Sequence, residues 1–272
     1  MAVLAILGVI FGIGLAFASR VFHVHVDPRL ERVTETLPGI NCGACGYAGC
    51  EAYADAVVHG ERPDLCMPGG QETALALAHI MGQKLDEERR PVRAVVHCQG
   101  DCEASPNRYV YDGIPDCRAA HALQGGPKLC EYGCLGYGSC ARACPFGAIT
   151  MSEERLPVID RDVCTGCGTC VRTCPRDLIE TLPQEVTIAL ACSNRGPAKE
   201  ARRVCTYGCI KCRKCVRVSE EETVEMIDNL PRLSYEPGAD YGPAMEACPQ
   251  DCFVKVLDRG FERKVREEAA KV

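Results

Sequence analysis

Closely spaced cysteines constrain the fold of this chain more than any other feature. The sequence has 22 cysteines among 272 residues, and many stand two or three residues apart, several of them directly before proline. A cysteine-dense chain is either a disulfide scaffold or a metal protein. Disulfide scaffolds are mostly short and seldom repeat these spacings, so the pattern favours metal sites.

The clearest motif is the run Cys164-Thr-Gly-Cys167-Gly-Thr-Cys170-Val-Arg-Thr-Cys174-Pro175. Its spacing is that of bacterial ferredoxins, in which the fourth cysteine ligates the other of two [4Fe–4S] clusters. An earlier copy contains Cys130, Cys134, Cys140 and Cys144-Pro145, with Tyr137 in the place of the middle cysteine. Cross-ligation therefore predicts two sets of four ligands: Cys130, Cys134, Cys140 and Cys174, and Cys164, Cys167, Cys170 and Cys144.

The segment between these two copies is expected to form the β-hairpin of a ferredoxin. Residues 156–160 should pair as a strand with Ile149 and Thr150. The proline after each fourth cysteine should stop the turn before a short helix, which gives the pseudo-twofold βαβ arrangement.

A separate four-cysteine motif precedes these copies. Cys42, Cys45, Cys50 and Cys66 have the spacing C-x2-C-x4-C-x15-C, with glycines between them. Four thiolates can hold one [4Fe–4S] cube, and glycines leave backbone N–H groups free to bond its sulfurs. A structural zinc site is the alternative, because zinc also binds four cysteines. Helices are expected over residues 51–59 and 71–84.

A third ferredoxin-like module follows the second copy. Its expected ligands are Cys209, Cys212, Cys215 and Cys248, the last directly before Pro249. Ser219 stands where a cross-ligating cysteine belongs, so this module is expected to hold one cluster.

The remaining cysteines allow a conditional fifth cluster. Two apolar, strand-like runs, residues 94–98 and 188–192, each end in cysteine before a ferredoxin module. If they lie side by side, the fifth ligand set is Cys98, Cys102, Cys117 and Cys192. The alternatives are Cys205 as the fourth ligand, a zinc site, or free buried thiols. Cys252 is interpreted as a buried apolar thiol without a ligand role. The sequence therefore predicts four [4Fe–4S] clusters and a conditional fifth.

The N-terminus carries an uncharged apolar run from Ala2 to Ser19. As a helix it would be about 27 Å long, close to one hydrocarbon thickness. A cleaved signal peptide is the alternative, since Ala16-Phe17-Ala18 resembles a cleavage site. The absence of a basic residue before the run favours a retained anchor, and the arginines after it place the globular part in the cytoplasm. We therefore expect a single-pass protein of the inner (cytoplasmic) membrane that contacts lipid through residues 1–26.

The expected fold class is α+β: a transmembrane helix, a small α-rich single-cluster domain, and tandem ferredoxin-like modules. The expected boundaries are 1–26 for the anchor, 27–90 for the single-cluster domain, 91–197 for the two-cluster domain with its upstream cysteine segment, 198–258 for the third module, and 259–272 for a charged helical tail.

The order of these parts resembles the B subunit of Rnf complexes, in its longer anaerobe-type form. The resemblance is carried by the apolar start, Asn41-Cys42-Gly43-Ala44-Cys45-Gly46, Asp116-Cys117-Arg118-Ala119-Ala120 and Cys134-Leu-Gly-Tyr-Gly-Ser-Cys140. It implies a subunit of a membrane-bound, ion-translocating ferredoxin:NAD⁺ oxidoreductase. Such a subunit takes electrons from reduced ferredoxin and relays them to partner subunits, while Na⁺ or H⁺ crosses the membrane.

Several functions are excluded or remain as alternatives. The net charge of −6 argues against a nucleic-acid partner. No glycine-rich dinucleotide motif appears, so no catalytic residue is expected on this chain and nicotinamide chemistry belongs to other subunits. A relay subunit of a hydrogenase or formate dehydrogenase, and a zinc-stapled scaffold, are the alternatives. Arg202 and Arg203 are interpreted as solvated surface charge, with docking of an acidic protein such as ferredoxin as the second interpretation.

Overall fold

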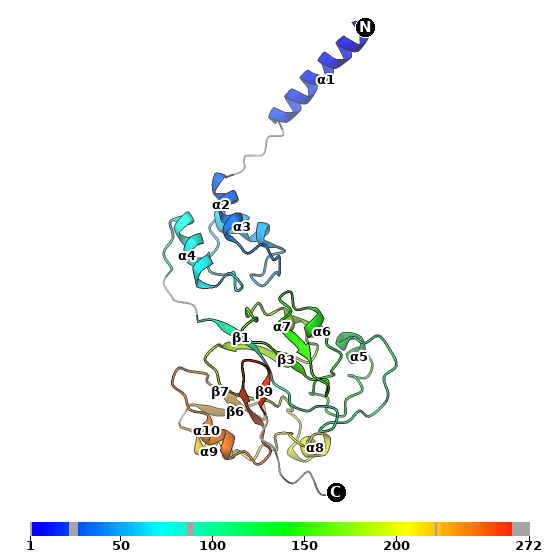
Figure 1. Cartoon of the computed structure of the whole chain (residues 1–272), viewed down its shortest axis with the longest axis vertical. Coiled ribbons are helices and arrows are strands. Elements are labelled where there is room, and N and C mark those ends of the chain that lie inside the picture. Colours follow the sequence, from blue (N-terminus) through cyan, green and yellow to red (C-terminus); the bar gives the residue numbers. More distant parts are fainter. Residues whose placement is uncertain (1, 22–26, 86–89, 221, 263–272) are drawn as a thin grey trace.

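The computed structural model describes residues 2–21, 27–85, 90–220 and 222–262, and side chains are described from residue 6 onward in the first helix. Helix α1 (Ala2–Val21) stands at one end of the molecule (Figure 1). A small helical domain comes next, followed by a larger α+β body. The C-terminal module of that body lies at the end opposite α1.

The helical domain packs three short helices around one apolar core. They are α2 (Pro28–Thr36), α3 (Cys50–Val58) and α4 (Gly70–Met81). Val33, Tyr53, Val57 and Leu77 are almost fully buried at their contacts. The two helices expected from sequence form as α3 and α4, and α4 ends earlier than expected because Gly82 adopts φ +66°.

The body contains two modules with the same order of elements. In the first, strand β1 (Val92–Val96) pairs antiparallel with β4 (Ile179–Pro183), and β2 (Ile149–Met151) pairs with β3 (Pro157–Ile159). Helices α5 (Cys117–Ala122), α6 (Ser139–Arg142) and α7 (Thr169–Thr173) complete it. The hairpin expected from residues 149–160 is confirmed, with Ile149 opposite Ile159.

The second module repeats the order strand, helix, hairpin, helix, strand. Strand β5 (Ile188–Leu190) pairs with β8 (Phe253–Val256), which also pairs with β9 (Phe261–Glu262). The hairpin is β6 (Val224–Ile227) with β7 (Leu230–Leu233), and the helices are α8 (Ala198–Val204), α9 (Lys214–Val218) and α10 (Gly242–Glu246). The long insertion before Cys248 is therefore the hairpin and second helix of a complete ferredoxin-like module.

The segment between β7 and α10, which follows the hairpin as the second cysteine run does in the first module, contains no cysteine. Tyr235 and Tyr241 stack edge to face with ring centroids 5.8 Å apart, and the Tyr235 N–H donates to the Tyr241 hydroxyl at 2.7 Å. The Ser219 hydroxyl donates to the carbonyl of Cys215 at 2.8 Å, so it acts within its own helix end.

Strands β1 and β5 do not pair with each other. Each pairs with the strand after the last Cys-Pro step of its own module, because that pairing closes the module's hydrophobic core. The segments that follow them do meet, since the Gln99 N–H donates to the Ala191 carbonyl at 3.2 Å. Cys98 and Cys192 are therefore brought together by the loops and not by strand pairing.

The expectation of a single-pass membrane protein is wrong. Within the part of the chain that the structure describes, no helix is both long enough and apolar enough to span a bilayer. The transmembrane helix, the inner-membrane location and the lipid contact expected from residues 1–26 have no support. Of the expected helical tail, Phe261 and Glu262 form β9, and residues 263–272 lie outside the described part.

Candidate iron–sulfur centres

All 22 cysteines lie in the described part of the chain, and none of them forms a disulfide. The cysteines instead gather in groups around cavities and tight loops. Among the described residues, no three His, Cys, Asp or Glu side chains converge closely enough to hold a single metal ion. Sets of four cysteines are the donor set that a [4Fe–4S] cube requires.

The Cys42 quartet comprises Cys42, Cys45, Cys50 and Cys66. Asn41 holds the loop by accepting the N–H of Cys50 on its side-chain oxygen at 2.8 Å, and Cys50 begins α3. Gly43 and Gly46 have φ +66° and +91°, which lets the chain curl around the site. Burial raises the pKa of the Cys66 thiol, and the other three cysteines raise it further. The expected members of this site therefore lie together.

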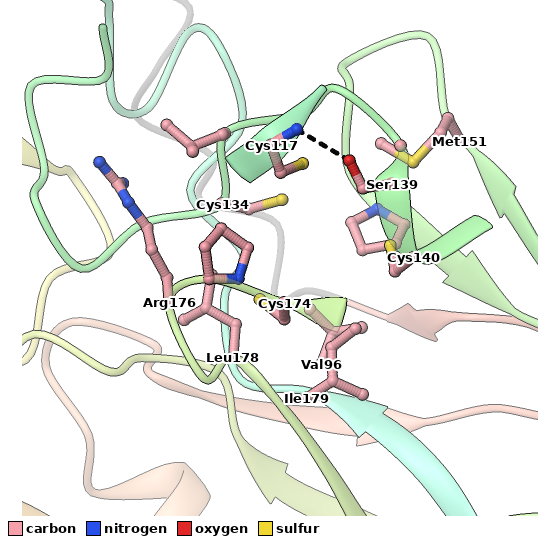
Figure 2. A pocket seen from close by; sticks show the side chains of 14 residues that line it. Val96, Cys117, Cys134, Ser139, Cys140, Met151, Cys174, Arg176, Leu178 and Ile179 are labelled. Carbon is pink, nitrogen blue, oxygen red and sulfur yellow. Dashed lines mark hydrogen bonds between the residues drawn. The ribbon is translucent and has the colours of Figure 1, made fainter. Parts of the chain in front are cut away.

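The Cys117 quartet lines an apolar cavity between α5, α6 and the start of β4 (Figure 2). Its members are Cys117, Cys134, Cys140 and Cys174. Burial raises the pKa of Cys140 to about 11, and the neighbouring Cys117 and Cys174 add to that shift. Cys174 reaches this cavity from the second cysteine run, as cross-ligation expects, but Cys130 does not line it.

A pair of polar side chains holds Cys117 in this position. Asp116 caps α5 by accepting the N–H groups of Arg118 and Ala119. Ser139 accepts the N–H of Cys117 at 2.8 Å (Figure 2) and donates to Asp116 at 2.7 Å, which lowers the pKa of that carboxyl. Asp116-Cys117 therefore places a distant cysteine beside Cys140, and the N-cap aspartate was the sequence signal for it.

Tyr137, which stands in place of the missing middle cysteine, does not line the cavity. Its ring lies 5.3 Å from that of Tyr111, and the Arg155 guanidinium lies 5.1 Å from its centroid. Cys117 thus takes the position that sequence reasoning gave to Cys130.

The Cys164 quartet comprises Cys164, Cys167, Cys170 and Cys144. The first three surround the loop before α7, and burial together with the neighbouring Cys164 and Cys167 raises the pKa of Cys170 to about 12. Cys144 packs against the same buried core as Cys164 and Cys170. The Ala94 N–H points at the Cys164 sulfur from 3.5 Å.

The Cys98 quartet lines a cavity between the two modules: Cys98, Cys130, Cys192 and Cys205. The Asn194 amide nitrogen lies 3.5 Å from the Cys130 sulfur. Gly100 approaches so closely that an added β-carbon would lie 3.1 Å from the Cys205 sulfur. Burial raises the pKa of Cys205 to about 12. The structure thus groups Cys98 with Cys192, as expected, and adds Cys130 and Cys205.

Two cysteines expected in this set lie elsewhere. Cys117 belongs to the neighbouring cavity, and Cys102 is exposed, with its thiol donating to the Glu154 carbonyl at 3.4 Å. The alternative of Cys205 as a member agrees with this cavity, but sequence reasoning did not place Cys130 there, although Cys130 and Cys205 are equivalent positions of the two modules. That equivalence was the signal available for pairing them.

The Cys209 quartet lines a cavity at the start of α9: Cys209, Cys212, Cys215 and Cys248. Cys252 lines the same cavity, is 1 % exposed, and lies within hydrogen-bonding reach of the Cys192, Cys209 and Cys248 sulfurs. That contact is the main reason why the pKa of Cys248 falls to about 6. The four expected members therefore face one cavity, and Cys252 has polar contacts that sequence reasoning did not expect.

Two known families match the cysteine-rich segments. A putative Fe–S cluster family matches residues 37–68, and a 4Fe–4S dicluster domain family matches residues 128–181. These matches cover the Cys42 quartet and both runs of the first ferredoxin-like module. The fold and the sites thus define an iron–sulfur protein of electron transfer that carries [4Fe–4S] clusters.

Curated relatives cover nearly the whole chain. The B subunit of a Na⁺-translocating ferredoxin:NAD⁺ oxidoreductase complex from Acetobacterium woodii is 41 % identical over 96 % of this chain and 78 % of its own length. A proton-translocating counterpart from Clostridium ljungdahlii is 41 % identical over 99 % and 96 %. The B subunit of an ion-translocating oxidoreductase complex from Methanosarcina acetivorans is 36 % identical over 92 % and 95 %. The chain belongs to the family of Rnf complex B subunits and is the electron-transfer iron–sulfur subunit of such an oxidoreductase.

Proposed function

We propose that this chain holds five [4Fe–4S] clusters and relays electrons from reduced ferredoxin to the other subunits of an ion-translocating ferredoxin:NAD⁺ oxidoreductase complex. The proposed ligand sets are the Cys42, Cys117, Cys164, Cys98 and Cys209 quartets. They use all cysteines except Cys102 and Cys252. Each cluster, when bound, takes up and releases one electron.

The observation that carries this proposal is a pair of matching hydrogen bonds. The Cys134 N–H donates to the Cys98 sulfur at 3.3 Å, and the Cys209 N–H donates to the Cys192 sulfur at 3.3 Å. Each bond joins a residue of one quartet to a sulfur of the Cys98 quartet. N–H donors to ligand sulfurs stabilise the reduced state and raise the reduction potential. The Cys98 quartet therefore bridges the two ferredoxin-like modules.

Further contacts extend the order of the sites along the molecule. Cys140 of the Cys117 quartet is close enough to Cys170 to influence its pKa. Arg172, between Cys170 and Cys174, places its guanidinium 3.4 Å from the Cys42 carbonyl. The proposed order is thus the Cys209, Cys98, Cys117, Cys164 and Cys42 quartets, which follows the long axis of the body toward α2–α4.

In this proposal electrons enter at the Cys209 quartet and leave from the Cys42 quartet. The entry end lies away from the helical domain (Figure 1). The helical domain then delivers electrons to partner subunits of the complex. The proposal also places flavin and NAD⁺ chemistry on those partners, because the chain lacks a dinucleotide-binding motif.

Metal analysis of the full-length protein, purified without oxygen, tests the cluster count. The proposal requires about twenty irons and an equal amount of acid-labile sulfide per chain. It also requires broad visible absorption that is bleached first by reduced ferredoxin and then fully by dithionite. A colourless protein that contains only zinc would contradict the proposal, and about sixteen irons would contradict the fifth site alone.

A further inference from the structure

The three ferredoxin-type loops of this chain share a backbone conformation but differ in charge. Each loop has two residues in the left-handed region, one on each side of its central residue. They are glycines in the first two loops: Gly136 and Gly138, then Gly166 and Gly168, with φ between +70° and +75°. In the third loop Lys211 and Arg213 take these positions at φ +58° and +59°.

Lysine and arginine are less favourable than glycine for this backbone conformation. A left-handed conformation is uncommon for residues with a β-carbon, and strained residues of this kind cluster at functional sites. Arg213 precedes α9 in the same conformation in which Gly138 precedes α6 and Gly168 precedes α7. Glycine takes this conformation without strain in the first two loops. Lysine and arginine in the third loop therefore strain the backbone, and they add two positive charges.

The surroundings of the first left-handed residue in each loop explain why only the third loop carries a side chain there. A β-carbon on Gly136 would lie 2.8 Å from the Arg155 carbonyl oxygen, and one on Gly166 would lie 2.5 Å from that of Val92. The first two loops are therefore covered by other parts of the chain. The third is open: Arg213, Lys214 and Arg217 are exposed. Cys212 is partly exposed, whereas its counterpart Cys167 is buried.

The resulting surface is positive in a protein that is negative as a whole. We define the cationic rim as Lys211, Arg213, Lys214 and Arg217, which surround the Cys209 quartet. Lys211 is anchored by donating to the Asn194 and Cys209 carbonyls at 2.8 and 2.7 Å, and the Arg217 guanidinium donates to the Cys212 carbonyl at 3.1 Å. Among the described residues that line the cavity of this quartet, two are cationic and none is acidic.

We propose that the cationic rim is the docking surface for a small acidic electron-donor protein, which delivers its electrons at the Cys209 quartet. This inference rests on the proposed function and names the place where ferredoxin binds. The chain as a whole carries a net charge of −6, so a cluster of cations attracts an acidic partner that the overall charge repels, and complementary charge steers encounter and orientation. On docking, one electron passes from the donor, which is oxidised, to the relay, which is reduced, and no bond forms or breaks.

The test replaces two exposed residues of the rim with the corresponding residues of the second loop. The variant Arg213→Gly with Lys214→Thr copies Gly168 and Thr169, and it relieves the left-handed arginine, so folding and cluster content should be preserved. The control Arg32→Gln with Lys84→Gln removes the same charge from exposed positions of the helical domain. Full-length, cluster-loaded proteins are mixed with a purified acidic two-cluster bacterial ferredoxin, either pre-reduced in stopped flow or oxidised in a calorimeter.

The rim variant should be reduced about tenfold more slowly than the wild type at low ionic strength. It should also bind oxidised ferredoxin more weakly and show a shallower salt dependence, whereas dithionite should still reduce it fully. The control should stay within about twofold of the wild type. Equal rates and salt dependence in the rim variant and the wild type, or equal losses in the control, would overturn the docking surface alone. A wild-type protein that dithionite reduces and ferredoxin does not would overturn the proposed function as well.

Discussion

The backbone N–H of Cys134 donates a 3.3 Å hydrogen bond to the sulfur of Cys98, although the two residues face different cavities. The same bond recurs between Cys209 and Cys192. The two bonds occupy equivalent positions of the two modules, since Cys134 and Cys209 each open a ferredoxin-type run. The cavity between the modules is thus linked to both of them by equivalent groups.

The first prediction separates Cys117 from Cys130. The Cys117→Ala protein should lose the cluster of the Cys117 quartet, while the Cys130→Ala protein should lose the cluster between the modules, because each residue lines only its own cavity. Each variant should lose about four irons. EPR of the dithionite-reduced proteins should show different signals missing from the two. The grouping fails if Cys130→Ala removes the signal that depends on Cys174 and Cys117→Ala leaves it intact.

The second prediction concerns the cap that holds Cys117. Asp116→Ala removes the acceptor for the N–H groups of Arg118 and Ala119 and the partner of Ser139. Loss of an N-cap costs about 1 kcal/mol, which corresponds to roughly a fivefold change in a local opening equilibrium. Iron release from the Cys117 site to a chelator should therefore be about fivefold faster. Asp27→Ala removes a comparable cap from α2 and serves as the control. Equal release from both variants would show that the cap does not act on the site.

The third prediction assigns a role to the Cys252 thiol. Cys252 follows Cys248-Pro249 as Ala148 follows Cys144-Pro145, and both positions are buried. The thiol donates to the Tyr207 carbonyl at 3.3 Å, and it is close enough to ligand sulfurs of two quartets to lower the pKa of Cys192 and of Cys248. The Cys252 N–H donates to the Cys248 sulfur at 3.3 Å. Cys252→Ala removes only the thiol contact, so the reduced state loses stabilisation.

Redox titration followed by EPR should show a lower midpoint potential in the Cys252→Ala protein, by on the order of 20–40 mV. Iron content should be unchanged. Cys102→Ala, which removes the exposed cysteine outside the quartets, should leave all potentials in place. A loss of four irons from Cys252→Ala would instead make Cys252 a ligand.

The fourth prediction compares two glycines with similar backbone angles. Gly166 and Gly238 have φ +70° and +84°, but only a β-carbon on Gly166 meets another atom, the Val92 carbonyl oxygen at 2.5 Å. Both alanine variants carry about 1–2 kcal/mol of left-handed strain. Gly166→Ala should lose about 1–3 kcal/mol more, because β1 must move.

Thermal bleaching of the visible absorption compares these variants. The Gly166→Ala protein should bleach at a clearly lower temperature than the Gly238→Ala protein. Identical bleaching temperatures in the two variants would show that β1 does not contact the Gly166 loop in solution.

Local motifs predicted part of the secondary structure. The short helix expected after each Cys-Pro step was wrong, because a turn and then β2 or β4 follow Pro145 and Pro175. The hairpin of residues 149–160 and helices α3 and α4 follow from spacing, apolar pattern and glycine positions, which act over a few residues. The apolar run at the N-terminus was a weaker guide. It predicted a helix, and α1 forms, but the described helices do not meet the requirement for a membrane span.

The sequence by itself determined that this protein is an iron–sulfur relay, because ligand spacing within each run is a local property of the chain. It also marked the two divergent positions, Tyr137 and Ser219. Only the tertiary structure decided which distant cysteines lie beside each run. Cys117 lies beside Cys140 through the Asp116 and Ser139 contacts, and Cys130 meets Cys205 because the two modules pack with their equivalent loops facing each other. Such pairings depend on how the modules pack together, and the spacing of cysteines within a run carries no information about that packing.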